Sequence, residues 1–74
     1  MKSIYSGEYQ KLVEKLKQAR LSAGLTQKEV AQKLGKPQSF VSKVEAGERR
    51  LDIIELNKLS RMYKKSINFF MENL

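Results

Sequence analysis

The fold of this chain is decided by residues 25–47, which read LTQKEVAQKLG, a single lysine, and then PQSFVSKVEAG. Thr26 and Glu29 are spaced as a capping box, in which each side chain bonds the other residue's backbone N–H at the start of a helix. Gly35 accepts the left-handed backbone that commonly ends a helix. The stretch over about residues 26–47 therefore predicts a short helix, a tight turn and a second short helix.

The second helix of this pair is expected from about Gln38 to Ala46, because the φ of Pro37 suits a helix start and Gly47 stops the helix. The spacing of the apolar residues predicts which sides face inward. The inward residues of the two helices are Val30, Ala31, Leu34, Val41 and Val44. In DNA-binding versions of this motif, the second helix enters the major groove.

Inward-facing valines leave the polar side of the second helix facing outward. The residues expected to contact base edges are Gln38, Ser39, Ser42 and Lys43. A glutamine pairs with N6 and N7 of adenine, a lysine donates to O6 or N7 of guanine, and small serines permit close approach. The alternative is that any amphipathic surface helix has a polar outer face. The turn and the basic composition together favour a helix that reads DNA.

Three further helices are expected around this pair. Ser6 caps the first, Gly24 ends it, Asp52 and Glu55 form a capping box at the fourth, and Ser66 caps the fifth. The expected apolar positions of the first helix are Tyr9, Leu12, Val13, Leu16, Ala19 and Ala23. Those of the fourth are Ile53, Leu56, Leu59 and either Met62 or Tyr63, and those of the fifth are Ile67, Phe70, Met71 and Leu74.

No segment alternates apolar and polar residues as a strand would, so the fold class is all-α with five helices. We expect residues 1–74 to form one domain, since 74 residues are too few for two, with residues 1–6 as a loose N-terminal arm. The apolar faces of the helices are needed for one another. We expect no ligand pocket in so small a domain.

The composition restricts the classes of function. The chain has 15 Lys and Arg against eight Asp and Glu, a net charge of +7, which favours a polyanionic partner. It has no cysteine and no histidine, so we expect no metal site, no cofactor and no enzyme activity. The N-terminus lacks the apolar segment of a signal peptide, and no run is long enough to span a bilayer. We therefore expect a cytoplasmic protein with no membrane partner.

The pattern from Leu25 to Gly47, followed by Arg49-Arg50-Leu51-Asp52, resembles the Cro and phage-repressor type of helix-turn-helix proteins, also called the XRE family. With its flanking helices, the resemblance extends over roughly residues 9–71. It implies a compact, five-helix, lambda-repressor-like domain whose third helix reads DNA. The implied function is sequence-specific binding to double-stranded DNA and regulation of transcription, as a repressor on a pseudo-palindromic operator.

The resemblance also implies roles for single residues. Gln27 matches a position that contacts a phosphate and often braces the recognition-helix glutamine, which is Gln38 here. Arg49 and Arg50 lie in the loop that runs beside the DNA backbone in the family. With the positions of Lys28 and Lys36 beside the expected DNA-facing surface, the predicted phosphate contacts are Gln27, Lys28, Lys36, Arg49 and Arg50, and Lys43 is a further candidate.

Arg20 and Glu45 match an ion pair that the family often buries between helices one and three. The residues support it independently, because Arg20 falls on the apolar side of the first helix, where an unpaired charge is costly. Glu45 borders the inward side of the third helix. We therefore predict a structural ion pair between them.

Some residues depart from the family pattern. Pro37 replaces the usual hydroxyl cap of helix three, and Lys64 stands where a glycine usually ends helix four. A left-handed backbone at a non-glycine residue costs on the order of 1 kcal/mol. Phe40 either packs on the core edge, which we favour, or meets a thymine methyl group.

A single recognition helix contacts few base pairs, so we expect a homodimer on two half-sites. The apolar C-terminus suggests Phe69, Met71 and Leu74 as the dimer-forming residues, although they could instead seal the core. The alternative function is an antitoxin or accessory module that uses the same fold to hold a protein partner.

Overall fold

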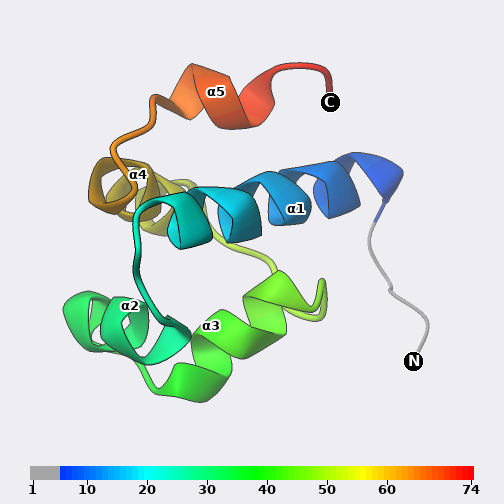
Figure 1. The fold of residues 1–74 in the computed structure, drawn as a ribbon. Helices are drawn as coiled ribbons and strands as arrows, with labels where there is room; N and C mark the ends of the chain where they lie inside the picture. The colour runs from blue at the N-terminus through cyan, green and yellow to red at the C-terminus, as the bar shows by residue number, and fades with distance from the viewer. Residues whose placement is uncertain (1–5) are drawn as a thin grey trace.

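The computed structural model describes residues 6–74, and the arm predicted over residues 1–6 lies outside this range except for Ser6, which caps the first helix. The helices are α1 (Gly7–Ser22), α2 (Gln27–Leu34), α3 (Gln38–Glu45), α4 (Ile53–Met62) and α5 (Ile67–Met71). Helix α1 runs through the middle of the molecule, with α2 and α3 on one side of it and α5 on the other (Figure 1). The expected all-helical fold with five helices is confirmed, and none of the helices in the described residues is long and apolar enough to cross a membrane.

The hydrophobic core joins all five helices. Its most completely buried side chains are Leu16 of α1, Val30 of α2 and Phe70 of α5. Helix α3 contributes Val41 and Val44, which are 4% and 3% exposed, as its apolar spacing predicts. Burying these residues is favourable by roughly 1.5–3 kcal/mol for each large apolar side chain. The core therefore fixes which side of α3 is left for a ligand.

Both predicted capping boxes are present. At α2, Glu29 N donates to Thr26 Oγ1 over 3.1 Å, and Thr26 N donates to Glu29 Oε1 over 2.8 Å. At α4, Glu55 N donates to Asp52 Oδ1 over 2.7 Å, and Asp52 N donates to Glu55 Oε1 over 2.9 Å. Helix α3 begins after Pro37 with no side-chain cap, as its sequence predicts.

Two left-handed residues set the turns that follow α2 and α4. Gly35 ends α2 with a φ of 70°. Lys64, two residues after the end of α4, has a φ of 58°, so the lysine adopts the backbone that a glycine would adopt without strain. The sequence predicts a left-handed residue at this position. The chain therefore turns from α4 to α5 at Lys64 although this backbone strains a lysine.

The expected apolar positions were wrong at Ile53 and Ala23, and Met71 of α5 is also exposed. Ile53 is 65% exposed, because it opens the first turn of α4 beyond the edge of the core. The inward stripe of α4 instead includes Ser60, which is 3% exposed and whose hydroxyl donates to the Asn57 carbonyl over 2.8 Å. Ala23 follows the last helical residue of α1 and is exposed.

Candidate nucleic-acid interface

The residues predicted to contact bases lie together on the outer side of α3. Gln38 and Ser39 occupy its first two positions, and both are exposed, as is Lys43 in its last turn. Ser42 is half-buried, and its hydroxyl donates to the Ser39 carbonyl over 3.2 Å. The oxygen of that hydroxyl keeps its capacity to accept a hydrogen bond. Helix α3 therefore presents an amide, two hydroxyls and an ammonium group on one side.

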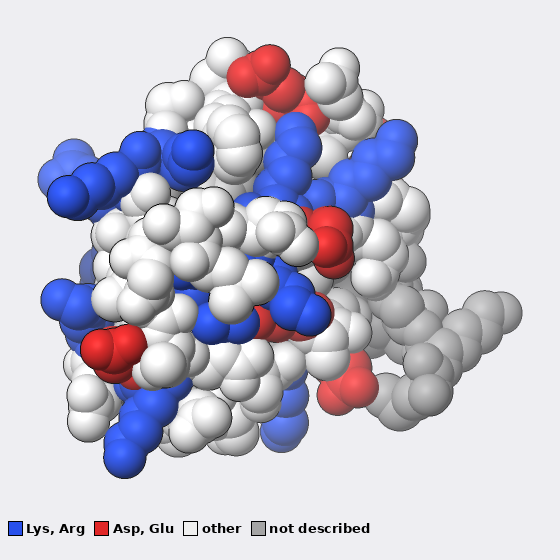
Figure 2. Space-filling view, in the orientation of Figure 1, with Lys and Arg blue, Asp and Glu red and all other residues white. Residues whose placement is uncertain are grey.

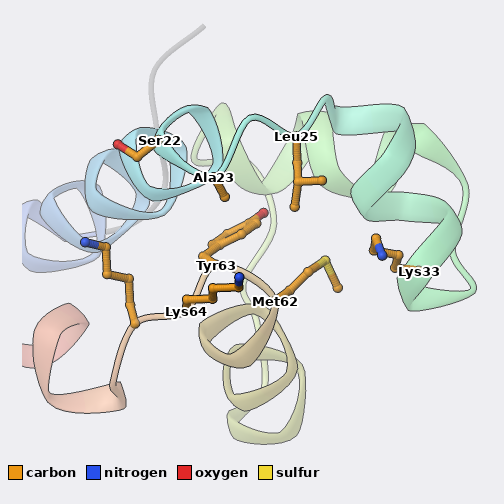
Figure 3. A pocket seen from close by; sticks show the side chains of 8 residues that line it. Ser22, Ala23, Leu25, Lys33, Met62, Tyr63 and Lys64 are labelled. Atoms are coloured by element: carbon orange, nitrogen blue, oxygen red, sulfur yellow. The ribbon is translucent and has the colours of Figure 1, made fainter.

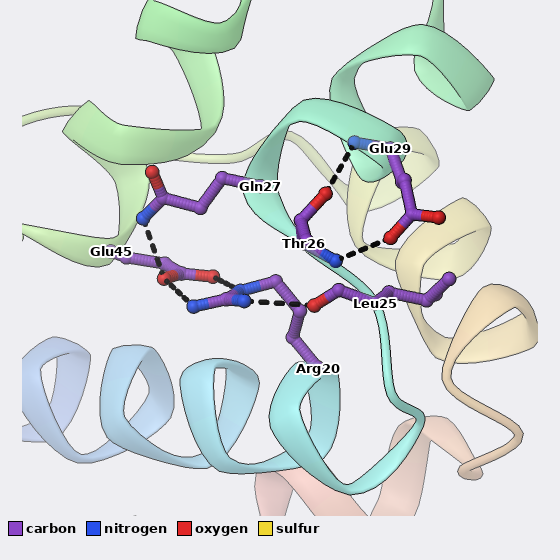
Figure 4. Close-up of polar contacts among 6 residues, drawn as sticks. All are labelled: Arg20, Leu25, Thr26, Gln27, Glu29 and Glu45. Atoms are coloured by element: carbon purple, nitrogen blue, oxygen red, sulfur yellow. Dashed lines mark hydrogen bonds and ion pairs between the residues drawn. The ribbon is translucent and has the colours of Figure 1, made fainter.

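An ion pair anchors α3 to α1 (Figure 4). Arg20 Nε donates to Glu45 Oε2 over 2.7 Å, and the guanidinium donates again to Glu45 Oε1 over 3.0 Å. A third bond runs from the guanidinium to the Leu25 carbonyl over 2.8 Å. Arg20 and Glu45, which the sequence predicts to pair, are thus joined in a two-pronged contact that also holds the segment before α2.

This ion pair lies inside the molecule, with its two side chains 9% and 6% exposed. The hydrogen bonds to Glu45 raise the pKa of Arg20, so the guanidinium stays charged. In such a site, two parallel charge-assisted bonds fix the relative orientation of two planar groups as well as their distance. The end of α3 is therefore held rigidly against α1.

Gln27 adds α2 to the same network. Its Nε2 donates to Glu45 Oε1 over 3.0 Å, and the side chain is half-buried. The structure thus pairs the Gln27 amide with Glu45, whereas the resemblance implies a brace to Gln38. A primary amide has two hydrogens, so one remains for a phosphate after the bond to Glu45.

The predicted phosphate contacts have different surroundings. Lys28 is exposed on α2. The Lys36 ammonium lies 3.8 Å from Glu55 Oε2 and 5.3 Å from the centre of the Phe40 ring. The Arg49 guanidinium lies 4.7 Å from the same ring. Phe40 is 6% exposed, so its favoured role as a packing residue is confirmed, and its ring supports two of the predicted cations.

Tyr9 is a positioning residue that the sequence analysis placed only on the apolar face of α1. Its hydroxyl donates to the Arg49 carbonyl over 2.7 Å and accepts from Leu51 N over 3.2 Å. The Arg50 guanidinium lies 5.6 Å from the centre of the tyrosine ring. Tyr9 therefore ties the arginine-bearing loop between α3 and α4 to α1. The sequence did contain a signal for this role, because Tyr9 ends an apolar stripe and a tyrosine in such a place usually forms a hydrogen bond through its hydroxyl.

The basic side chains on the face drawn in Figure 2 do not form one continuous patch. Lysines and arginines lie there at several separate places with acidic residues between them. The net charge of +7 attracts a polyanion but does not by itself mark one binding face. The candidate interface is instead the polar side of α3 together with the loop that Tyr9 holds.

The three residues suggested for a dimer interface differ in exposure. Met71 is 40% exposed. Phe69 and Leu74 are half-buried and pack against the core, and the Phe69 ring meets Phe70 edge-on with centroids 5.1 Å apart. Sealing the core, which was the alternative for these residues, therefore accounts for part of their surface.

The largest exposed apolar side chains lie elsewhere, at the start of α4. Ile53 is 65% exposed and its neighbour Ile54 is 61% exposed. They follow directly after the loop that carries Arg49 and Arg50. This is a second apolar surface near the residues predicted to contact phosphates.

Comparisons with known proteins agree with this geometry. A family model described as helix-turn-helix matches residues 16–70. Among solved structures, an XRE-family like protein from Pseudomonas syringae pv. tomato str. DC3000 is similar, with 48% sequence identity and a TM-score of 0.78. The likeness covers 86% of this chain and 78% of that chain. A comparison with curated proteins finds no match.

The matched residues run from the middle of α1 to Phe70 in α5 and include the whole of α2 and α3. Sequence similarity and fold similarity therefore both extend beyond the two-helix motif to the helices that support it. The chain belongs to the XRE family of helix-turn-helix proteins, a family of DNA-binding transcription regulators.

Proposed function

We propose that this protein is a repressor that binds a pseudo-palindromic operator in double-stranded DNA as a homodimer. The observation that carries the proposal is the combination of an exposed polar side of α3 with a buried ion pair that helps to hold this helix in place. A rigidly held helix loses little conformational freedom when it enters the major groove. The protein binds and does not catalyse, and it acts where the DNA is, in the cytoplasm.

Base recognition is assigned to the outer side of α3. Gln38 at its first position pairs with adenine N6 and N7 in two hydrogen bonds, and Lys43 donates to guanine O6 or N7. Ser39 and Ser42 are short enough to let the helix approach the base edges. Each good two-bond pairing discriminates against a wrong base by roughly 1–3 kcal/mol.

Phosphate binding is assigned to the groups that surround α3. Gln27 and Lys28 contact one strand from the start of α2, while Arg49 and Arg50 contact the backbone from the loop before α4. Lys36 lies on the turn between α2 and α3. Each neutralised phosphate releases counterions, so binding weakens steeply as salt rises.

Dimer formation is assigned to apolar side chains outside the core. Of the three residues suggested by the sequence, Met71 has the most accessible surface, with Phe69 and Leu74 at its margin. Met71→Asp should turn a dimer into a monomer by sedimentation equilibrium at micromolar concentration. The matched variant Ile54→Asp tests the apolar pair at the start of α4, and a dimer lost only in that variant would move the interface there.

The function is tested by selecting duplexes from a random pool and measuring binding to the winner by fluorescence anisotropy at several salt concentrations. We expect a two-fold symmetric sequence, a steep salt dependence, and a loss of roughly 1–3 kcal/mol for Gln38→Ala. Gln18→Ala is the control, because Gln18 is an exposed glutamine of α1 whose side chain donates to Glu14 of the same helix over 3.2 Å.

Two outcomes would contradict the proposal. A pool without any enriched sequence would favour the alternative, an antitoxin or accessory module that holds a protein partner. Binding that is indifferent to both salt and Gln38 would exclude base reading through α3. Repression itself is measured by placing the selected sequence across a promoter, where the bound protein should lower transcription.

A further inference from the structure

A cavity of about 580 Å³ opens between the C-terminal ends of α1 and α4, close to the last turn of α2. This volume falls within the range of about 300–1,000 Å³ that is typical of small-molecule sites. The sequence predicts no ligand pocket in so small a domain, and this cavity is a feature that the sequence reasoning did not anticipate. The cavity exists because α1, α2 and α4 end near one another, and the side chains at three helix ends do not fill the space between them.

The walls of this cavity combine an apolar floor with a cationic rim (Figure 3). Leu25, Met62 and Tyr63 supply the apolar surface. Three lysines stand around it, which are Lys33, Lys64 and Lys65. None of the residues that line the cavity in the described part of the chain is acidic. The complementary ligand is therefore an anion that carries a compact apolar body.

The floor of the cavity touches the network that anchors the recognition helix. The Leu25 carbonyl accepts a hydrogen bond from the Arg20 guanidinium over 2.8 Å. Tyr63 is 4% exposed, and its burial, followed by the nearby charge of Glu45, raises the pKa of its hydroxyl. A ligand that presses on Leu25 therefore acts on the carbonyl that accepts from Arg20, while Tyr63 lies close enough for the charge of Glu45 to act on its hydroxyl.

One rim residue is held in a costly conformation. Lys64 has a φ of 58°, and a left-handed backbone costs a non-glycine residue on the order of 1 kcal/mol. Strained residues occur preferentially at sites of function. The strain places a lysine side chain at the mouth of the cavity, where a glycine would satisfy the backbone but leave no cation.

We propose that this cavity binds a small organic anion, a carboxylate on an aromatic or aliphatic body, and that its occupancy is coupled through the Leu25 carbonyl to the Arg20–Glu45 ion pair. The carboxylate faces Lys33 and Lys64, since the Lys65 ammonium lies over the Phe69 ring at 4.8 Å, and the apolar body lies on Leu25, Met62 and Tyr63. The ligand is a regulator of α3. The proposal that the cavity binds an anion does not depend on DNA binding. The proposal that this anion regulates α3 rests on the proposed DNA-binding function.

The test is a titration of the ¹⁵N-labelled full chain with 2-naphthoate, followed by NMR, with neutral 2-naphthamide as the matched probe. We expect saturable shifts of the amides of residues 23–25 and 62–65, with at least tenfold weaker binding of the amide. We also expect the Arg20 Nε–H signal to shift along with them. Lys33→Gln and Lys64→Gln should each weaken naphthoate binding several-fold, and Lys17→Gln, an exposed cation of α1 outside the cavity, should not.

Equal binding of the two probes, or shifts confined to other residues, would overturn the site. Shifts at the cavity with an unmoved Arg20 Nε–H signal would overturn the coupling. A further measurement repeats the anisotropy assay on the selected duplex with saturating naphthoate, where coupling requires a changed affinity. If no duplex is bound at all, the proposed function fails, and the NMR titration still decides the site.

Discussion

The two helix pairs α2–α3 and α4–α5 are built alike at their starts and turns but are held in place differently. Each pair opens with a capping box, and each contains a left-handed residue in the turn between its helices, Gly35 in the first and Lys64 in the second. Helix α3 is held at its end by the Arg20–Glu45 ion pair. Helix α5 is held by Phe70, which is fully buried.

The difference teaches how so small a domain presents a binding surface. An apolar side chain is stabilised only when it is shielded from water, so the apolar side of α5 is buried against the core. Helix α3 also buries Phe40, Val41 and Val44, and the charged anchor at its end adds a fixed orientation that leaves the polar side of the helix facing outward. The following predictions test this contrast, from the largest expected effect to the smallest.

Removing the charged anchor should cost the most stability. Arg20→Ala leaves Glu45 buried without its partner, and breaking a buried pair in this way lowers the free energy of unfolding by roughly 3–5 kcal/mol. Urea denaturation followed by circular dichroism measures the loss. Lys17→Ala, an exposed cation of the same helix, should change stability by less than about 0.5 kcal/mol. An Arg20→Ala protein as stable as the parent would rule out an anchoring role.

Exchanging the two turn residues should give effects of opposite sign. Gly35→Lys forces a side chain onto a backbone with φ of 70° and should cost roughly 1–2 kcal/mol. A Cβ atom at Gly35 would meet nothing within 4 Å, so this loss reports backbone strain, reduced by the freedom that the unfolded chain loses with its glycine. Lys64→Gly relieves the same strain but gives the unfolded chain more freedom, so stability should rise by at most about 1 kcal/mol.

Thermal unfolding of both turn variants gives the comparison directly. A clear stability loss in Lys64→Gly would show that the lysine makes contacts that outweigh its backbone strain. A Gly35→Lys protein with parental stability would mean that the turn after α2 tolerates a side chain as the turn after α4 does.

Removing either cap should have a similar and smaller effect. Thr26→Ala and Asp52→Ala each leave one backbone N–H of the first helical turn without its side-chain acceptor, a loss of about 1 kcal/mol. Denaturation under identical conditions compares the two variants. Equal losses would show that the helix pairs differ in their anchors and not in their starts, whereas losses several-fold apart would contradict that view.

The smallest effect should be a pH dependence from the capping box of α2. The hydrogen bonds from the Thr26 backbone, and then from its hydroxyl, lower the pKa of Glu29. A carboxylate whose pKa is lower in the folded state stabilises the fold above its unfolded pKa of about 4.3, and this contribution is lost as pH falls through the folded pKa. The melting temperature of the parent should therefore exceed that of Glu29→Gln at pH 7 and approach it near pH 3. A gap that stays constant over this range would contradict the assignment.

Much of the helix pattern was predictable because it depends on local chemistry. Capping boxes at Thr26 and Asp52 and the turn at Gly35 follow from bonds between residues a few positions apart. The inward side of α3 follows from the spacing of Val41 and Val44. The same reasoning failed at Ile53, because a helical period predicts a direction but does not tell where the core ends.

The residues of the candidate site likewise fall into those that the sequence predicts and those that it does not. The outward residues of α3 and the pairing of Arg20 with Glu45 could be predicted, the first from periodicity and the second from the family resemblance and the cost of an unpaired buried charge. The bond from Tyr9 to the loop at Arg49 could not, because it joins residues 40 positions apart whose pairing leaves no local pattern. The bond from Gln27 to Glu45 could not be predicted either, because the two residues belong to different helices and meet only when α2 and α3 pack together.

The sequence by itself determined that this protein is helical, where each helix begins and which family it resembles, because caps, turns and periodicity act over a few neighbouring residues. Only the tertiary structure decided which side chains from different helices contact one another. It joined Gln27 to the Arg20–Glu45 pair, brought Tyr9 to the arginine loop, and left a cavity where α1, α2 and α4 end. These features depend on how whole helices pack, and packing is set by the combined fit of many distant side chains.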